Sequence, residues 1–306
     1  MLRAPRPADH LLMRPPRVSA TLDDLPALHR SVEDGTLELL YQPEVELDSG
    51  ALVAMEGLLR WHHGDLGVLA PPAFLELAER SGDIGPIGHW VLQQGAAEAR
   101  RWQSLPGPQR RLWLNVSLAQ VSTPALADAV AEAVEAHGLP PGALGLEVSE
   151  ATVLRLGGTA ARRLTGLRAA GVALAVDDFS TWYATLGAIA DLPVDVVKLG
   201  ERYVRGIGEE GESADEGGRL TAMVSTIVDQ AHDHGMLVVA EAVETWTEAA
   251  RLTELGCDRA HGWLFASPQR ADRARWLLSR GTGWRGGVVT PQTRALPFVP
   301  TPRSST

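Results

Sequence analysis

Apolar residues along the chain fall into short runs, and most neighbouring runs are separated by stretches with apolar positions three and four residues apart. Short apolar runs bounded by turn residues predict buried strands, whereas the longer amphipathic stretches predict helices. We expect strands at residues 37–45, 51–61, 112–117, 144–149, 172–178, 194–199, 237–242 and 259–265. We expect helices at residues 72–80, 87–103, 124–137, 159–170, 219–234 and 247–255.

The alternation of strands and helices is typical of a parallel sheet, in which each helix returns the chain to the start of the next strand. The first two strands are an exception, because only the turn Leu47-Asp48-Ser49-Gly50 lies between them. A parallel crossover needs about a dozen residues or more, so these two strands should pair antiparallel. The length of 306 residues allows either two domains or one α/β barrel of about 250 residues.

Both ends of the chain differ in composition from its middle. Residues 1–25 are rich in arginine and proline and lack periodicity, which predicts a flexible leader. Residues 281–306 are rich in glycine and proline and predict a flexible tail, so the folded domain should span residues 26–280. Residues 206–218 are acidic and rich in glycine, which predicts a mobile loop.

Charge and composition limit the partners and the compartment. A formal net charge of −10 argues against a surface that binds a nucleic-acid polymer, although a small anionic ligand remains compatible with it. Cys257 is the sole cysteine, so no internal disulfide can form, which fits a reducing compartment. No run reaches the roughly 18 apolar residues of a membrane span. We therefore expect a cytoplasmic protein.

Two residue types occur once each. Of the 28 basic residues all but Lys198 are arginine, and Asn115 is the sole asparagine. This skew indicates that other residues have replaced lysine and asparagine at every position whose chemistry permits the change. The two survivors therefore indicate positions where a substitute fails, although chance explains either one taken alone about equally well.

Polar residues lie at or just beyond the ends of several predicted strands. They are Glu56, Arg60, Asn115, Glu147, Glu150, Asp177, Asp178, Lys198, Glu241 and Glu244. In a barrel of parallel strands the carboxyl ends converge on one rim, so these side chains would form one cluster. Crowded carboxylates repel one another unless cations or hydrogen bonds compensate. The cluster therefore predicts a bound cation.

The donor types indicate which cation this would be. Carboxylates with one amide oxygen, and without clustered cysteine or histidine, suit Mg²⁺ or Mn²⁺ better than Zn²⁺. Two such ions would stabilise the attacking and leaving oxygens of phosphodiester hydrolysis, and the adjacent Asp177 and Asp178 could serve neighbouring ions. Lys198 could hold a water or a phosphate, and Arg60 could bind a phosphate with two hydrogen bonds.

The chain resembles the EAL domain family, bacterial phosphodiesterases that linearise cyclic di-GMP. The resemblance spans about residues 31–268 and depends on many short motifs in order. These are Tyr41-Gln42-Pro43, Glu56-Gly57-Leu58-Leu59-Arg60-Trp61, Leu114-Asn115-Val116-Ser117, Leu146-Glu147-Val148-Ser149-Glu150, Asp177-Asp178-Phe179, Leu192-Pro193-Val194-Asp195-Val196-Val197-Lys198, Val239-Ala240-Glu241-Ala242-Val243-Glu244-Thr245 and Gly256-Cys257-Asp258.

The resemblance implies a modified TIM (β/α)8 barrel with one antiparallel strand, cyclic di-GMP as substrate, and a possible homodimer. It implies a role for each matching residue. One metal would be bound by Glu56, Asn115, Glu147 and Asp177, and a second metal by Asp178. Glu241 would order or activate the attacking water beside Lys198. Arg60 would bind phosphate, and Glu150 would steady a loop. The sole lysine and the sole asparagine both fall on family catalytic positions.

The chain also departs from the family pattern. Ser180 and Trp182 replace two glycines of the loop after Asp178, which in the family helps to organise the metals and the dimer contact. Gly200 stands where the family usually has an aspartate, and His261 replaces the usual glutamine. His261 could still hydrogen-bond a water or a guanine of the substrate.

Gly57 replaces an alanine and Ala242 replaces a glycine of the family motifs. We expect both changes to be tolerated.

Three hypotheses follow. The first is a Mg²⁺- or Mn²⁺-dependent phosphodiesterase that opens cyclic di-GMP to linear pGpG, and the complete carboxylate set favours it. The second is a receptor or interaction module of the same fold that binds the nucleotide with little or no turnover, favoured by Ser180, Trp182 and His261. The third, an aldolase-type barrel with Lys198 as a Schiff-base lysine, is disfavoured by the surplus of carboxylates.

Overall fold

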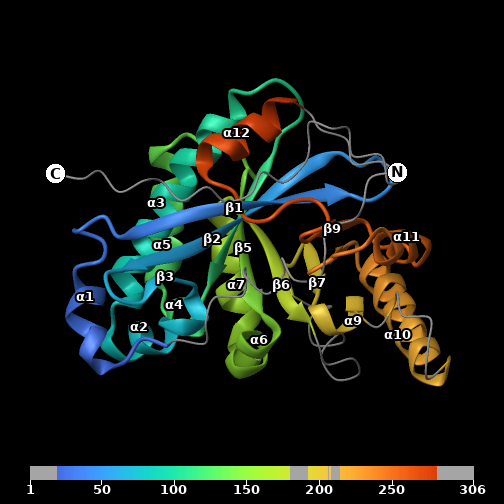
Figure 1. Ribbon diagram of the computed structural model, residues 1–306, viewed down its shortest axis with the longest axis horizontal. Coiled ribbons are helices and arrows are strands. Elements are labelled where there is room, and N and C mark those ends of the chain that lie inside the picture. Colours follow the sequence, from blue (N-terminus) through green and yellow to red (C-terminus); the bar gives the residue numbers. More distant parts are fainter. Residues whose placement is uncertain (1–18, 180–191, 206, 208–213, 281–306) are drawn as a thin grey trace.

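The computed structural model describes residues 19–179, 192–205, 207 and 214–280, and these form a barrel of strands surrounded by helices (Figure 1). The nine strands lie in the order β1-β9-β8-β7-β6-β5-β4-β2-β3, and an additional pairing of β1 with β2 closes the barrel. The strands are β1 Leu37–Glu46, β2 Leu52–His63, β3 Gly67–Leu69, β4 Arg111–Val116, β5 Leu144–Ser149, β6 Ala173–Phe179, β7 Val196–Leu199, β8 Leu237–Ala240 and β9 Arg259–His261.

Strand β1 runs antiparallel to both of its barrel neighbours, β2 and β9. The pairs from β2 through β4, β5, β6, β7 and β8 to β9 are all parallel. The prediction of a modified TIM barrel with one antiparallel strand is therefore confirmed. Strand β3 was not predicted; it extends β2 as a short antiparallel hairpin outside the closed barrel.

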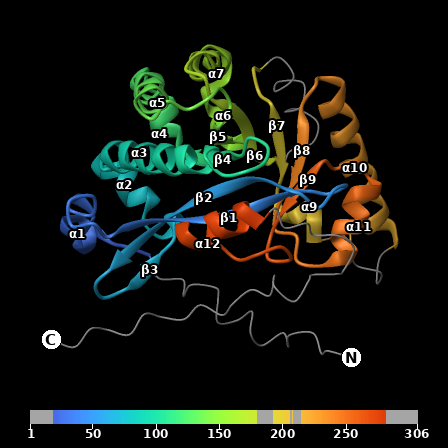
Figure 2. The same cartoon turned by 90° about the horizontal axis from the view of Figure 1, so that it is seen from above.

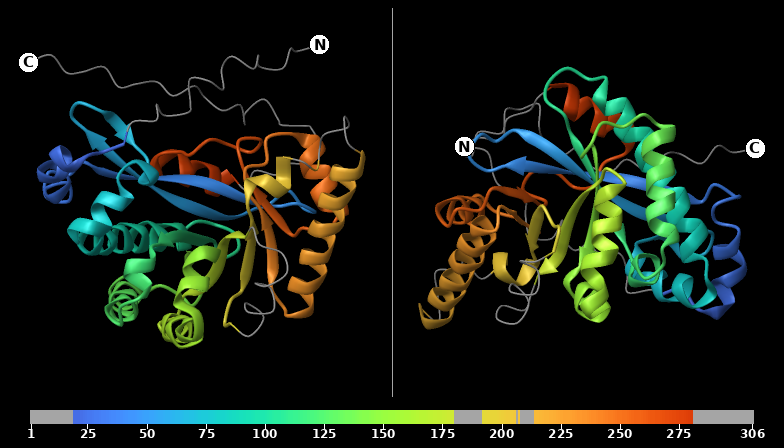
Figure 3. Two further views of the ribbon diagram at one scale, coloured as in Figure 1. Left: turned by 90° about the horizontal axis from the view of Figure 1, so that it is seen from below. Right: turned by 180° about the vertical axis from the view of Figure 1, so that it is seen from behind.

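Helices cover the outside of the barrel, as the view from above and the two views from below and behind show (Figures 2 and 3). They are α1 Leu25–His29, α2 Leu75–Ser81, α3 Ile84–Gln103, α4 Leu118–Val121, α5 Ala125–Ala136, α6 Glu150–Leu156, α7 Ala160–Ala169, α9 Glu201–Arg205, α10 Ala214–Asp233, α11 Trp246–Glu254 and α12 Ala271–Arg280. None of the helices in the described ranges combines the length and the apolar character that a bilayer crossing requires.

Some elements differ from the sequence prediction. Helix α10 begins at Ala214, inside the stretch predicted to be a loop. Helix α12 was not predicted, and its Arg275 donates to the buried Glu98 of α3 at 2.9 Å, a contact between residues far apart in the chain. This contact adds to the burial of Ala274, Leu277 and Leu278, which lie on one face of α12.

The end of the predicted leader also has structure. Residues Leu22–Asp24 form a 3-10 turn, and α1 begins at Leu25. The backbone nitrogen of Ala20 donates to the carbonyl of Ala73 at 2.7 Å, and Asp24 pairs with His63 at 3.1 Å. These contacts attach residues of the predicted leader to the domain, while residues 1–18 and 281–306 lie outside the described ranges.

The interior of the barrel is filled at mid-height by one large side chain among small ones. Trp113 is completely buried there, together with Ala54, Ala173, Ala175, Val196 and Val239. A Cβ atom on Gly145 would lie 2.2 Å from a ring carbon of Trp113, so the neighbouring strand must carry glycine at this position. This layer closes the barrel below the carboxyl ends of its strands and forms the floor of the candidate site.

We predict that Gly145→Ala destabilises the fold by about 3 kcal/mol, because the added methyl group overlaps a tryptophan ring that has no room to move. Urea unfolding followed by tryptophan fluorescence measures this change. Gly158→Ala is the matched control, since nothing lies within 4 Å of a Cβ atom at that position. Equal stability of the two variants would contradict the packing described for Trp113.

Candidate active site at the carboxyl ends of the strands

The last inward-facing residue of several barrel strands is polar. On β2, β4, β5 and β6 the polar residue follows two positions after a small or aromatic residue of the floor, so both face the interior. The residues that gather above the floor are Glu56 on β2, Asn115 on β4, Glu147 on β5, Asp177 on β6, Lys198 on β7, Glu241 just beyond β8 and His261 on β9. The convergence predicted from the sequence therefore occurs.

Lys198 lies at the centre of this cluster and is only 1% exposed. Its ammonium nitrogen contacts Glu147 Oε1, and it lies 3.4 Å from Glu241 Oε1 and 3.6 Å from Glu56 Oε2. Burial alone would lower the pKa of Lys198, but these carboxylates raise it well above its usual value. A lysine that stays protonated is not a nucleophile, which argues against the Schiff-base hypothesis.

Asn115 supplies the amide of the cluster. Its Nδ2 atom donates to Glu56 Oε1 at 2.8 Å, while the other oxygen of Glu56 faces Lys198. Glu56 is thus fixed between an amide and an ammonium group, and it lies in the wall of the barrel at 7% exposure. The amide oxygen of Asn115 is not engaged in this hydrogen bond, so the amide can serve as a donor to Glu56 and as a ligand at the same time.

Glu147 and Asp177 are the two carboxyl groups of the cluster whose pKa values are raised most. Burial raises the pKa of both carboxyl groups well above their usual range, and neighbouring carboxylates raise them further. Glu147 is 1% exposed, and its Oε2 atom has no hydrogen-bond partner among the described residues. Four carboxyl groups, those of Glu56, Glu147, Asp177 and Glu241, thus lie near one ammonium group, and this excess of acidic groups favours binding of a further cation.

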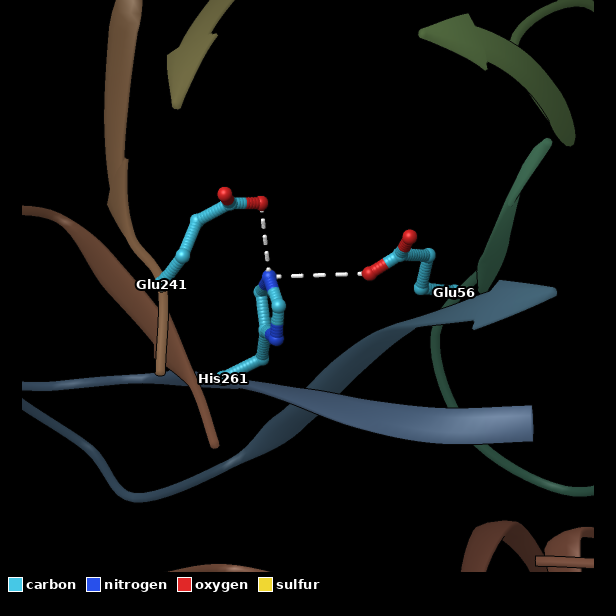
Figure 4. A group of neighbouring side chains, drawn as sticks. All are labelled: Glu56, Glu241 and His261. Atoms are coloured by element: carbon cyan, nitrogen blue, oxygen red, sulfur yellow. Dashed lines mark hydrogen bonds and ion pairs between the residues drawn. The ribbon is translucent and has the colours of Figure 1, made fainter. Parts of the chain in front are cut away.

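Glu241 differs from its neighbours. Burial alone would raise its pKa, but Lys198 and a hydrogen bond from His261 lower it to about 2. His261 Nε2 lies 2.9 Å from Glu241 Oε1 and 3.6 Å from Glu56 Oε2 (Figure 4). The hydrogen bond with Glu241 raises the pKa of His261 despite burial. The structure thus places His261, predicted as a substrate contact, among the carboxylates.

Three further predicted site residues lie around this cluster. Asp178 is exposed, with its backbone nitrogen donating to Asp177 Oδ1 at 2.8 Å. Burial raises the pKa of Asp178, and the nearby carboxylates of Glu241 and Glu150 raise it further. Glu150 is buried at the start of α6. Arg60 donates to the carbonyl of Leu59 at 2.8 Å. Burial lowers the pKa of Arg60, and Glu56 opposes this change.

The structure explains one departure from the family pattern. A Cβ atom on Gly200 would lie 2.6 Å from Asp178 Oδ1, so any side chain at position 200 would displace the Asp178 carboxylate from its present position. Asp178 itself has a φ of 52°, which is uncommon for a residue other than glycine. The glycine at position 200 therefore provides space that the Asp178 carboxylate occupies.

Two other departures from the family pattern, Gly57 and Ala242, differ in how the structure accommodates them. Gly57 lies where a Cβ atom would be 2.7 Å from the side chain of Leu114, so Leu114 occupies the space of the missing methyl group. Ala242, where the family has glycine, keeps a φ of 55°, a conformation that costs an alanine about 1–2 kcal/mol. Ser180 and Trp182 lie outside the described residues.

The donor set fits a divalent metal ion. Carboxylate oxygens of Glu56, Glu147, Asp177 and Glu241 and the amide oxygen of Asn115 are ligands that Mg²⁺ and Mn²⁺ prefer. The unpartnered oxygen of Glu147 and the raised pKa values of Glu147 and Asp177 are the features of a site that gains by accepting positive charge. The geometry therefore supports these residues as candidate ligands.

We predict that Lys198→Met destabilises the metal-free protein by about 3–5 kcal/mol, because it leaves several buried carboxylates without a counter-charge. Urea unfolding in EDTA measures the loss. Arg80→Met, which removes an exposed partner of Glu76, should change stability by about 1 kcal/mol or less.

Adding Glu147→Gln to Lys198→Met should restore part of the lost stability, since the double variant buries less unbalanced charge. A Lys198→Met protein as stable as the wild type in EDTA would contradict the central role of the ammonium group.

Known proteins are similar to this chain in both sequence and fold. The chain is 36% identical over 253 residues to the protein Rv1354c of Mycobacterium tuberculosis, which covers 82% of this chain and 40% of the relative. It is 34% identical over 246 residues to the bifunctional diguanylate cyclase/cyclic di-GMP phosphodiesterase MucR of Pseudomonas aeruginosa, covering 80% of this chain and 35% of MucR. The chain thus spans about two fifths or less of the length of these relatives.

A solved structure described as the PaMucR phosphodiesterase in complex with c-di-GMP matches with a TM-score of 0.76 and 33% identity. The match covers 83% of this chain and all of that chain. The sequence pattern that defines the EAL domain matches residues 26–268. The segment so defined contains every residue of the cluster around Lys198, and the chain belongs to the EAL domain family.

Proposed function

We propose that this chain hydrolyses cyclic di-GMP to linear pGpG with the help of bound Mg²⁺ or Mn²⁺. The observation that carries the proposal is the cluster of Glu56, Asn115, Glu147 and Asp177 around the buried Lys198, because these are the four residues that the family resemblance implies as ligands of one metal. The similarity to the MucR phosphodiesterase, whose structure is described as a c-di-GMP complex, supports the same substrate.

The bound ions would supply Lewis-acid stabilisation of the phosphodiester and would lower the pKa of a bound water. Glu56, Asn115, Glu147 and Asp177 would hold one ion. The carboxylate of Asp178, which Gly200 leaves room for, would serve a second ion.

The protein groups around the ions have separate tasks. Glu241, with its pKa held at about 2, stays ionised and accepts a hydrogen bond from the attacking water, which orients the water toward phosphorus. Lys198 provides a fixed positive charge next to Glu241 and stabilises negative charge that develops on the phosphate. Arg60, on the strand that carries Glu56, would bind a phosphate oxygen of the nucleotide.

A receptor that binds cyclic di-GMP without turnover is the second candidate. The observation that favours it is the 2.9 Å hydrogen bond between His261 and Glu241, because this bond occupies the carboxylate oxygen that would accept from the attacking water. The two candidates differ in one measurable respect, the appearance of linear product.

We predict that the purified protein with Mn²⁺ converts cyclic di-GMP to pGpG, and that Glu56→Gln lowers the rate at least about 100-fold, since loss of a group that orients a ligand already costs about 10–100-fold. Chromatography of the nucleotides measures both rates. Glu76→Gln, on the exposed face of α2, is the control and should keep the wild-type rate.

Each outcome separates the candidates. Nucleotide that binds, measured by calorimetry, but stays intact after prolonged incubation supports the receptor. Neither binding nor cleavage overturns both candidates.

A further inference from the structure

His261 is the one nitrogen donor in a group of three side chains that could share a metal ion in the described part of the chain. Carboxylate oxygens of Glu56 and Glu241 and a ring nitrogen of His261 all lie within 4.8 Å of one another (Figure 4). The three residues come from β2, from the end of β8 and from β9, so strands fix all three backbones. His261 and Glu56 are 8% and 7% exposed.

The separations suit ligands of one ion. Ligand atoms that each bind a metal at about 2.0–2.2 Å lie roughly 3–4 Å apart. His261 Nε2 lies 2.9 Å from Glu241 Oε1 and 3.6 Å from Glu56 Oε2, which agrees with both values. The three ligand atoms are therefore close enough for one ion, which would share Glu241 Oε1 and Glu56 Oε2 with the Lys198 ammonium group, 3.4 and 3.6 Å from them.

The imidazole can present a lone pair at Nε2. Of the two ring nitrogens, Nε2 is the one that faces the carboxylates of Glu56 and Glu241. His261 Nδ1 is buried and has no hydrogen-bond partner among the described residues, so no protein group fixes the tautomer from that side. A neutral imidazole with its hydrogen on Nδ1 has a lone pair at Nε2, the nitrogen that faces both carboxylates.

We propose that His261 is a direct ligand of a divalent ion held with Glu56 and Glu241, and that its nitrogen biases the site toward Mn²⁺ and later first-row metals over Mg²⁺. Imidazole suits transition metals, whereas Mg²⁺ prefers oxygen ligands and retains water. The glutamine of the family pattern would offer an oxygen at this position. The inference rests on the proposed metal-dependent function and specifies which residue makes this chain selective.

Metal binding without nucleotide tests the proposal. Titration calorimetry of the apo-protein gives the affinities for Mn²⁺ and for Mg²⁺, and pulsed electron paramagnetic resonance of the Mn²⁺ complex detects a directly bound imidazole nitrogen. The wild type should show this nitrogen coupling and should prefer Mn²⁺. His261→Gln should lose the coupling and bind Mn²⁺ about 10–100-fold more weakly, with at most about a threefold change for Mg²⁺.

His232→Gln is the matched control, because His232 lies on α10 and pairs with Asp258 at 2.9 Å, away from the cluster. This control should keep both the nitrogen coupling and the preference for Mn²⁺. Melting temperatures of the apo-proteins verify that both variants fold.

The results separate the inference from the proposed function. Nitrogen coupling that persists in His261→Gln, or equal losses of Mn²⁺ and Mg²⁺ affinity, overturns the inference alone. A wild type that shows the coupling but does not cleave cyclic di-GMP supports the inference and overturns the phosphodiesterase proposal. A wild type that binds neither ion overturns both.

Discussion

One buried ammonium group neutralises carboxylates that would otherwise repel one another inside the barrel. Lys198 contacts three glutamates and is itself inaccessible to solvent, so its charge acts in surroundings that screen it weakly. Four carboxyl groups lie near this single positive charge, and burial together with their mutual repulsion raises the pKa of Glu147 and Asp177. The protein therefore holds an arrangement of oxygen donors of the kind that suits a divalent cation, and every functional proposal depends on that arrangement.

The same arrangement depends on the layer beneath it. Trp113 fills the barrel at mid-height because its neighbours are alanine, valine and glycine, and Gly145 leaves space for the indole ring. A tightly packed floor restricts the charged residues to one end of the barrel and fixes the strands that carry them. Functional side chains placed on strands above a rigid layer keep their relative positions better than side chains on loops do.

Unfavourable backbone conformations occur beside the site. Asp178 and Ala242 are the residues other than glycine with a positive φ among the described residues, and each directly follows a carboxylate of the cluster. Such conformations cost about 1–2 kcal/mol for a residue with a side chain, and proteins retain them mainly at functional positions. Both positions therefore lie directly beside carboxylates of the candidate site, Asp177 and Glu241.

The sequence by itself determined the eight strands of the closed barrel, the antiparallel pairing of the first two strands, and the identity of the charged residues at the strand ends. These features follow from local periodicity and from a turn too short for a crossover. Helix α12 was not predicted, although its buried Ala274, Leu277 and Leu278 are spaced as on one face of a helix; its contact with α3 is visible only in the tertiary structure. Only the tertiary structure decided that Gly200 makes room for Asp178, and that His261 faces Glu241 and Glu56. Distances between residues far apart in the chain depend on how the closed barrel packs, and no local pattern records them.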